Sequence, residues 1–352
     1  MKIAVAGATG AVGQQMIQCL EERLPQAEIK ALASARSAGK VLSFQKQYVI
    51  EELTENSFDD VDYVLGATEN DITAWWAPLA VKAGAVVVDN SSLYRLKDDV
   101  PLVIPEINPE DILTNHGIIA NPNCATIIAL VAVNALHQRW HVERMIVSTY
   151  QAVSGAGMQG IRDLEAQVKD PAVPSVAFPH PIAYNLIPQI GSFDEEGYSS
   201  EERKMQNEGR KIWHHPELLV NCTCVRVPTM RSHAESITLQ FREKPDLDEA
   251  RELLKQAEGV VLADDPKNHV YPMPLTTSDQ DLVYVGRLRK DVSDLKEHSL
   301  VLFCSGDQIR KGAATNTVQI LEKLLASKYS QSCSGSFSFL RYLFYGKKRI
   351  IL

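Results

Sequence analysis

Short apolar runs alternate with longer stretches of helical periodicity along the first third of the chain. The runs lie at residues 3–7, 29–33, 63–67, 85–88, 102–104 and 118–120. Helical patterns follow several of them, from Val12 to Leu24, from Ile72 to Ala83 and from Cys124 to about Arg139. Strands that alternate with helices predict a parallel sheet covered by helices on both faces. The first part of this α/β chain is therefore expected to form a Rossmann-type doubly wound parallel sheet.

Beyond about residue 140 the pattern is less regular. Residues 142–152 and 220–242 alternate apolar and polar positions, which is typical of strands with one buried face. Further strands are expected around 260, at 283–289 and at 300–305, with helices at 160–168, 201–212 and 246–257 and a last one ending near 327. The stretch 201–212 is rich in charge, as solvent-exposed helix faces usually are. At 352 residues, the chain exceeds the usual size of one hydrophobic core, so we expect two domains.

A glycine-rich turn joins the first strand to the first helix. It reads Gly7-Ala8-Thr9-Gly10-Ala11-Val12-Gly13, with glycines at every third position. Such a turn lets backbone N–H groups approach a pyrophosphate at the helix N-terminus. The strand before it and the helix after it favour a dinucleotide site over an ordinary strand–helix turn. The predicted cofactor-binding residues of the turn are Gly7, Thr9, Gly10, Ala11, Val12 and Gly13.

The end of the second predicted strand indicates which dinucleotide binds. An NAD-selective site usually has an acidic residue here that binds the ribose 2′-hydroxyl. This chain instead has Ser34, Arg36 and Ser37, whose hydroxyls and guanidinium suit a 2′-phosphate. We therefore predict NADP rather than NAD as the cofactor; the alternative is that Arg36 is only a solvated surface residue.

One cysteine lies where an apolar run meets a long helical pattern. Cys124 follows Asn121-Pro122-Asn123, in which either asparagine can cap the helix. A thiol at a helix N-terminus ionises more readily, and the thiolate is the reactive form. We therefore expect Cys124 to be a nucleophile; the alternative is a buried structural cysteine.

Other polar residues follow predicted strands and could serve such a cysteine. Arg95 comes shortly after a strand end and could hold a substrate anion, or form a surface salt bridge. Gln151 precedes a small-residue run at 154–157 and could orient a reacting group. His233 follows Arg226 by seven residues, and a histidine is a natural proton shuttle for a cysteine enzyme, although a lone histidine is more often structural.

Composition excludes several other classes. The net charge of −8 argues against a nucleic acid or an anionic membrane as the main partner. The six cysteines lack zinc spacing, and we expect no metal site. The N-terminus lacks the pattern of a signal peptide and no apolar run is long enough for a membrane span, so we expect a cytoplasmic protein.

Ten motifs, in order, resemble those of the NADP-dependent aspartate-β-semialdehyde dehydrogenases typical of bacteria. They are GATGAVG at 7–13, SARSAGK at 34–40, VVDNSS at 87–92, VPLVIPEIN at 100–108, NPNCATI at 121–127, STYQAVSGAG at 148–157, CVRVP at 224–228, SHAES at 232–236, VGRLRKD at 285–291 and KGAATN at 311–316. The resemblance covers roughly residues 1–328. It implies reduction of L-aspartyl-4-phosphate to aspartate semialdehyde with NADPH, the branch point toward lysine (through diaminopimelate), methionine and threonine.

The resemblance also implies roles for individual residues. Cys124 would attack the acyl phosphate, with Gln151 assisting and His233 acting as general acid/base. Arg226 would bind the substrate α-carboxylate and Glu201 its amino group. The choice of Glu201 over Glu202 rests on the three-residue spacing to Lys204.

The remaining implied contacts concern the phosphate group and the cofactor. The phosphate-binding residues would be Arg95, Asn123 and Lys204. Further cofactor contacts would come from Ser154, Gly155, Gly157 and Asn316.

The implied organisation is an NADP-binding domain of residues 1–128 and 312–328, with an α+β catalytic and dimerisation domain of residues 129–311 built on a mixed sheet. A homodimer with a small-molecule substrate is expected. Two other functions stay open at this point. One is N-acetyl-γ-glutamyl-phosphate reductase, which shares the fold and the cysteine chemistry. The other is a non-catalytic NADP-binding paralogue.

Two segments depart from the family pattern. Where the family has a small Ser/Gly-rich run lining the cofactor, this chain has Glu69, followed by Trp75 and Trp76. The acid at Glu69 would weaken NADPH binding unless it points outward. The tail 329–352 has no family counterpart: it is Ser-rich, then apolar and aromatic, then basic. We expect it to be poorly ordered or to dock in an oligomer, rather than to attach to a membrane surface.

Overall fold

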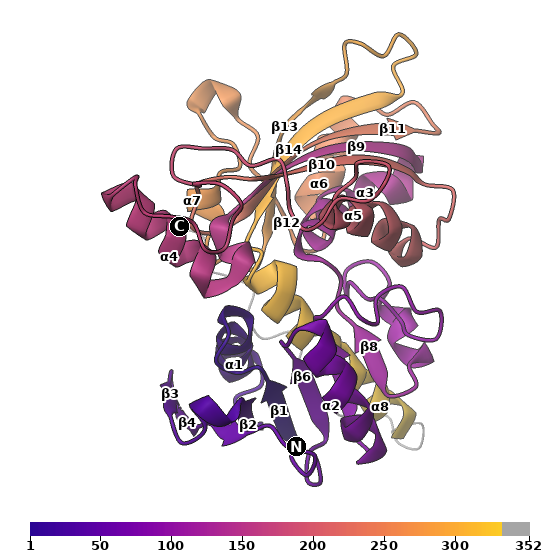
Figure 1. The fold of residues 1–352 in the computed structure, drawn as a ribbon. Helices are drawn as coiled ribbons and strands as arrows, with labels where there is room; N and C mark the ends of the chain where they lie inside the picture. Colours follow the sequence, from indigo (N-terminus) through magenta and orange to yellow (C-terminus); the bar gives the residue numbers. More distant parts are fainter. Residues whose placement is uncertain (333–352) are drawn as a thin grey trace.

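In residues 1–332, which the computed structural model describes, two six-stranded sheets organise the chain. The first sheet, in the lower half of Figure 1, is parallel throughout. Across the sheet its strands are β5 (Glu51–Glu52), β2 (Glu28–Ala33), β1 (Lys2–Ala6), β6 (Tyr63–Gly66), β7 (Val86–Asp89) and β8 (Ile118–Ala120). A small hairpin of β3 (Val41–Ser43) and β4 (Gln47–Val49) lies beside it. The predicted doubly wound sheet is confirmed.

Helices cover the first sheet because its strands are apolar on both faces. These helices are α1 (Ala11–Arg23), α2 (Asn70–Lys82) and, from the far end of the chain, α8 (Thr315–Ser332). Val318 and Leu321 of α8 share a buried cluster with Ile3 and Val5 of β1 and with Met16 of α1. The last described helix therefore returns to the sheet that the chain built first (Figure 1).

The second sheet is mixed. Its order is β10 (Leu219–Arg226), β9 (Val142–Gln151), β11 (His233–Phe241), β14 (Ser299–Gly306), β13 (Val283–Lys290) and β12 (Val260–Leu262). The outer pairs β10–β9 and β12–β13 are parallel, and the inner pairs are antiparallel. Three helices pack on one face: α3 (Cys124–Trp140), α5 (Ser200–Ile212) and α6 (Leu247–Gln256). The remaining helices are α4 (Gly157–Lys169) and the short α7 (Pro274–Thr277).

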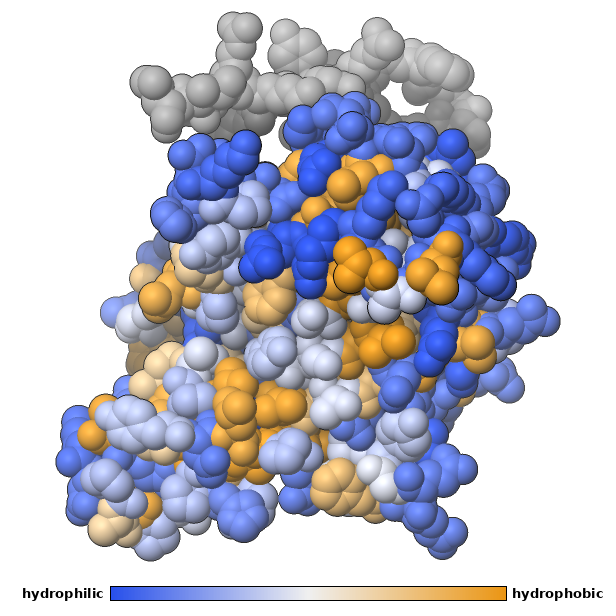
Figure 2. Space-filling view, turned by 90° about the horizontal axis from the view of Figure 1, so that it is seen from above, coloured by the Kyte–Doolittle hydropathy of each residue, from blue (hydrophilic) through white to orange (hydrophobic). Residues whose placement is uncertain are grey.

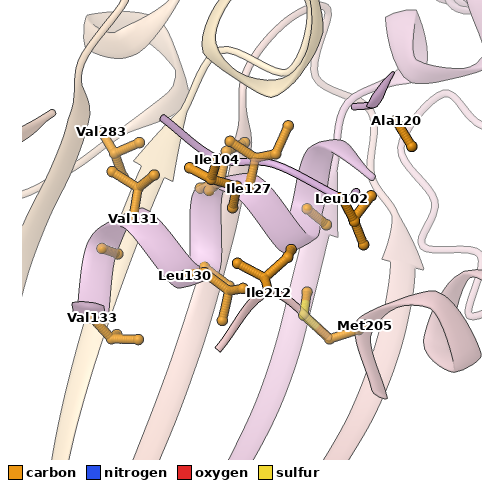
Figure 3. Close-up of a cluster of buried hydrophobic side chains, with 14 of the residues drawn as sticks. Leu102, Ile104, Ala120, Ile127, Leu130, Val131, Val133, Met205, Ile212 and Val283 are labelled. Carbon is orange, nitrogen blue, oxygen red and sulfur yellow. The ribbon is translucent and has the colours of Figure 1, made fainter. Parts of the chain in front are cut away.

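Helix α3 lies at the centre of the largest buried cluster (Figure 3). Its side chains Ile127, Leu130 and Val131 point in different directions, as expected of a helix buried on most sides. Leu130 faces Ile212 of α5, while Ile127 lies beside Ile104 of the first half of the chain. The helix that begins at Cys124 is therefore buried among apolar side chains from both halves of the chain.

Three local expectations are wrong. The apolar residues 102–104 are buried but form no strand beyond one bridge, from Leu102 to Ala120. Pro101 and Pro105 flank them, and a proline donates no ladder hydrogen bond. Helix α8 continues through Ser332, the last residue described, rather than ending near 327, so the expected tail begins inside a helix; its residues 333–352 lie outside those described. The third error concerns α5, which is not a solvated helix, as shown below.

No helix of residues 1–332 is long and apolar enough to cross a membrane.

Candidate active site

Cys124 is the first residue of α3, directly after the turn that leaves β8. Asn123 is the N-cap, and its side-chain oxygen accepts hydrogen bonds from the backbone N–H groups of Ala125 (3.0 Å) and Thr126 (3.4 Å). The expected cap is confirmed, with Asn123 rather than Asn121 in that role. The cap fixes the direction in which the helix presents the cysteine.

A π-helical turn, Arg310–Ala314, packs against the cysteine from behind. A Cβ at Gly312 would lie 2.8 Å from the Cys124 Cβ, so only glycine permits this approach. The neighbouring Lys311 is fully buried, and its Nζ donates to both carboxylate oxygens of Glu106, at 2.7 and 2.6 Å. This ion pair anchors the turn on which the cysteine rests.

His233 and Gln151 come from adjacent strands and meet at the sulfur. The His233 Nε2 lies 3.5 Å from the Cys124 Sγ and 3.4 Å from the Gln151 Nε2. The backbone N–H of Ala152 donates to the His233 Nδ1 at 3.1 Å. Because Nδ1 accepts this hydrogen bond, the neutral ring carries its hydrogen on Nε2, directed at the sulfur.

Glu201, on the first turn of α5, binds three of the predicted site residues. Its Oε1 accepts from the Asn123 side chain (2.9 Å) and from Gln151 (3.1 Å), and its Oε2 accepts from Lys204 (3.0 Å). Burial raises the pKa of this carboxyl, but the Lys204 charge and these hydrogen bonds outweigh burial and lower the pKa to about 2. Glu201 is therefore a carboxylate at every physiological pH.

Glu202 faces elsewhere. Its carboxylate accepts from the backbone N–H groups of Ser199 (2.6 Å) and Cys224 (2.9 Å), the first of which completes a capping box. Of the two neighbouring acids, Glu201 is the one that contacts the residues around Cys124. That it binds the substrate amine stays a prediction.

Arg226 is buried beside the histidine, opposite Gln151 in the register of β10 and β9. Its Nη1 donates to the carbonyl oxygen of Ala152 at 2.6 Å. Among residues 1–332 it forms no ion pair with a carboxylate, and burial lowers its pKa. A buried guanidinium without a counter-ion is suited to an anionic ligand.

Arg95 reaches the site from the loop after β7. Its Nη2 donates to the carbonyl of Asn90 (2.7 Å), and its Nη1 donates to Glu208 of α5 (3.0 Å). Its Nε is buried and has no hydrogen-bond partner within the described part of the chain. The second oxygen of Glu208 accepts from the backbone N–H of Asn123 at 2.7 Å.

Glu201, Glu202 and Glu208 are all buried on α5, so the expectation of a solvated helix face is wrong for this helix. Each of them accepts at least one hydrogen bond from a side chain or N–H group of another element. Charge density alone does not distinguish such a face from a solvated one.

The charges around the cysteine act on its pKa in opposite directions. Burial and the Glu201 carboxylate raise the pKa of the Cys124 thiol to about 12, against lowering by Arg95, Arg226 and Lys204. The expectation of a readily ionised thiol is therefore wrong for the unliganded site. Burial, followed by the Arg226 charge, lowers the pKa of His233 to about 3, so the ring is neutral.

The glycine turn lies between β1 and α1, as predicted. Gly7 has a φ of 87°, and a Cβ there would lie 2.3 Å from the Ala67 carbonyl oxygen. A Cβ at Gly13 would lie 2.2 Å from the Gly7 carbonyl oxygen. Gly10 is the exposed N-cap of α1 and supplies no side-chain cap, so the N–H groups of Ala11 and Val12 lie at an uncapped helix start. This cradle fits a dinucleotide phosphate.

Ser34, Arg36 and Ser37 lie just after β2, the strand next to β1. Ser34 and Arg36 are exposed, and Arg36 forms no ion pair with any described residue. Thr9 lies inside the glycine turn, where its carbonyl accepts from Gln14. These residues share one edge of the sheet, the edge that binds ligands in open α/β folds.

The other predicted cofactor residues are placed differently. Gly155 is exposed and would bring a Cβ within 3.2 Å of the His233 ring, and Gly157 follows with a φ of 74°. Ser154 is buried between the carbonyl of Met230 and the side chain of Gln308. Asn316 is fully buried and donates to Asn121 (2.7 Å) and to the Val103 carbonyl. Cofactor contact by these residues stays a prediction.

Glu69 is exposed at the N-cap of α2, and within residues 1–332 its side chain forms no ion pair and no cap hydrogen bond. Its effect on cofactor binding stays a prediction. Trp76 is fully buried, where its Nε1 donates to Thr68 at 2.9 Å, and Trp75 is 43% exposed. The two tryptophans thus have separate environments.

Sequence reasoning missed Glu208, Gly312 and the Ala152 N–H. Glu208 could have been found, because it follows Glu201 by seven residues and therefore lies on the same helix face. The contact of Gly312 with Cys124 joins residues far apart in the sequence, and no local pattern indicates it.

Two family models match the chain. Residues 2–115 match "Semialdehyde dehydrogenase, NAD binding domain", and residues 133–311 match "Semialdehyde dehydrogenase, dimerisation domain".

Relatives align along nearly the whole chain. An aspartate-semialdehyde dehydrogenase of Aquifex aeolicus is 46% identical over 92% of this chain and 98% of its own, and one of Campylobacter jejuni is 47% identical over 93% and 98%. A crystal structure of aspartate semialdehyde dehydrogenase II from Vibrio cholerae, complexed with ASA, superposes with a TM-score of 0.89. It is 40% identical and covers 92% of this chain and 98% of that chain.

Proposed function

The chain belongs to the aspartate-semialdehyde dehydrogenase family, and from this premise we propose the full reaction that it catalyses. The reaction is the reversible reductive dephosphorylation of L-aspartyl-4-phosphate to L-aspartate 4-semialdehyde and phosphate, with NADPH as reductant. It serves lysine (through diaminopimelate), methionine and threonine synthesis. One observation carries the proposal: the Cys124 Sγ lies 3.5 Å from the His233 Nε2, and the charges of two buried arginines, Arg95 and Arg226, act on the thiol.

Cys124 is the nucleophile in this proposal. The Cys124 sulfur attacks the acyl phosphate carbon while its thiol proton passes to a phosphate oxygen, and the C–O bond to phosphate breaks, which leaves a thioester and hydrogen phosphate. Gln151 supports this role because its amide is oriented by Glu201 and by the Thr149 hydroxyl, whose distance to the Gln151 oxygen is 2.9 Å. An oriented amide N–H can stabilise the oxyanion of the tetrahedral state.

His233 is assigned two roles, both through its Nε2: it stabilises negative charge on the sulfur or the substrate oxygen, and it transfers a proton. With its hydrogen on Nε2, the ring donates a hydrogen bond to the thiolate or to the substrate oxygen. Full proton donation requires a charged ring, and a proton on Nδ1 would face the Ala152 N–H. To act as a general acid, His233 must therefore lose its hydrogen bond from the Ala152 N–H. To donate a hydrogen bond from Nε2, the ring can keep that contact.

Different side chains of the site bind the carboxylate, amino and phosphate groups of the substrate. Arg226 binds the α-carboxylate and Glu201 the amino group, while Arg95, Lys204 and Asn123 bind the phosphate. Arg226 lacks a carboxylate partner in the described chain, and the low pKa of Glu201 keeps it anionic. A free amino acid carries both of the charges that this pair complements, whereas an N-acetylated substrate lacks the ammonium group.

NADPH supplies the hydride that reduces the thioester. The pyrophosphate would be held by the turn from Gly7 to Gly13, and the 2′-phosphate by Arg36 with Ser34 and Ser37. The free guanidinium of Arg36 supports NADP over NAD. Ser154, Gly155, Gly157 and Asn316 would contact the nicotinamide end.

We also propose a homodimer formed through the uncovered face of the second sheet. Ile146 and Tyr150 of β9 are exposed there, and the Tyr150 ring centroid lies 6.1 Å from that of Phe303, across β11 on β14. Seen from above, apolar side chains gather near the middle of the molecule with hydrophilic ones around them (Figure 2). A solution mass twice that of one chain is the expected result of light scattering.

The test is a substrate panel read by NADP reduction in the presence of phosphate. Aspartate semialdehyde is expected to give phosphate-dependent turnover and N-acetylglutamate semialdehyde none. Turnover of the acetylated substrate alone would replace the proposal with the reductase. Absence of turnover for both, with NADP still bound, would favour a non-catalytic paralogue.

A further inference from the structure

The carboxylate of Glu208 connects the two sides of the site and has no role in the reaction proposed so far. The residue is only 1% exposed. One oxygen accepts from the Arg95 Nη1 at 3.0 Å, and the other accepts from the backbone N–H of Asn123 at 2.7 Å. One side chain on α5 thus contacts both the arginine assigned to phosphate and the residue that precedes the nucleophile.

The contact with Asn123 completes the N-terminus of α3. In a capping box, a glutamate three residues into the helix accepts the N-cap backbone N–H. That position holds Thr126 here, which is too short for this contact, and its hydroxyl has no partner in the described chain. Glu208 supplies the missing acceptor from a different helix.

Both groups that face Glu208 are hydrogen-bond donors. A carboxylate satisfies both with one oxygen each, whereas an amide of the same shape has one oxygen and one NH2 group. In Glu208→Gln, one of the two donors would therefore face another donor. Aspartate keeps the charge, but it is one methylene shorter and reaches only one of the donors.

We propose that Glu208 is a positioning residue for phosphate transfer: it holds Arg95 in the orientation that receives the phosphate and fixes the turn that presents Cys124. The inference rests on the proposed function. Glu208 touches neither substrate nor sulfur, so it acts through Arg95 and Asn123.

Glu202 provides a matched control. It is also buried on the same helix, and its carboxylate also bridges two N–H donors, but these belong to Ser199 and Cys224. Glu208→Gln and Glu202→Gln therefore impose the same conflict at different places. Both variants are compared by melting temperature and by KM for phosphate, for NADP and for aspartate semialdehyde.

The expected result is that both variants melt lower, while only Glu208→Gln raises the KM for phosphate, by about tenfold or more, as loss of a charge-assisted hydrogen bond predicts. The KM for NADP stays within about twofold, since the cofactor loop shares no contact with Glu208. In an Arg95→Met background, Glu208→Gln adds little to the KM for phosphate. Equal phosphate KM values for the Glu208 and Glu202 variants would overturn the inference.

A second readout does not depend on turnover. Inorganic phosphate bound at Arg95 should slow the alkylation of Cys124 by iodoacetamide in the wild type and in Glu202→Gln, but not in Glu208→Gln. If the wild type shows no phosphate-dependent turnover, the proposed function fails, and this protection still decides the inference. Equal protection of all three proteins, or of none, would overturn it. If Glu208→Gln does not fold, Glu208→Asp takes its place in both measurements.

Discussion

At the cofactor loop, Gly7 and Gly13 leave no space for a side chain, and the groups offered to a ligand are N–H groups at an uncapped helix start. Around Cys124 the groups offered are buried side chains, and almost every one is held by another, from Asn123 to Glu201 and from Arg95 to Glu208. Ligand binding at the cofactor loop depends on backbone space, whereas the region around Cys124 depends on the charges of its side chains. Changes in the cofactor loop should therefore leave the region around Cys124 largely intact, and the reverse should hold; five variants test this separation.

The largest effect is expected at the nucleophile. Cys124→Ala should lower kcat by about four orders of magnitude or more, because no other group near His233 can form the thioester. NADP affinity, measured by fluorescence titration, should stay within about twofold of the wild type, as additivity of distant sites predicts. Substantial turnover in this variant would remove the covalent mechanism.

A change in the cofactor loop should have the opposite pattern, with weaker NADP binding and unchanged reactivity of Cys124. Gly13→Ala places a Cβ 2.2 Å from the Gly7 carbonyl, so the turn must deform. NADP affinity should fall by about a hundredfold, in line with the cost of a strained backbone position. The rate at which iodoacetamide alkylates Cys124 should not change. A matching loss of thiol reactivity would show that the two regions are coupled.

A smaller effect is expected on the preference for NADP over NAD. Arg36→Ala removes a charge-assisted contact with the 2′-phosphate, which predicts about a tenfold to hundredfold weaker NADP binding. NAD, which lacks that phosphate, should bind as before. Equal weakening of both cofactors would assign Arg36 to the loop structure instead.

The smallest effect concerns the thiol pKa. Burial and Glu201 raise that pKa to about 12, so the alkylation rate of Cys124 should climb with pH through at least pH 9 without a plateau. Glu201→Gln removes a negative charge and should lower the pKa, which raises the rate at pH 7 several-fold. Lys204→Met removes a positive charge and should lower that rate. A plateau near pH 7 in the wild type would refute the raised pKa.

The same contrast explains what the sequence alone could predict. The glycine turn and the first sheet are local patterns, and the glycine spacing and strand–helix alternation indicated them correctly. The strand predicted at 102–104 is wrong because apolar content predicts burial, but it does not predict ladder hydrogen bonds next to prolines. Helix α5 misled because charge density cannot tell a solvated glutamate from one buried against an arginine.

The thiol shows a further limit. A helix N-terminus lowers a thiol pKa, and that effect is local to Cys124. The Glu201 carboxylate comes from a helix that follows some 75 residues later, and residues even further along, such as His233 and Gly312, help to bury the thiol. Only the folded chain brings them together. Motif resemblance selected residues that the fold brings together around Cys124, but it carried no information about their ionisation.

The central claim is that Cys124 carries the acyl group between phosphate and hydride transfer. To test it, the protein is mixed with aspartate semialdehyde and NADP without phosphate and quenched in acid. The masses of its proteolytic peptides are then measured by mass spectrometry. The account predicts an aspartyl thioester on the peptide that contains Cys124, a matching burst of NADPH, and neither in Cys124→Ala. NADPH formed without that thioester, or an acyl group on another residue, would contradict it.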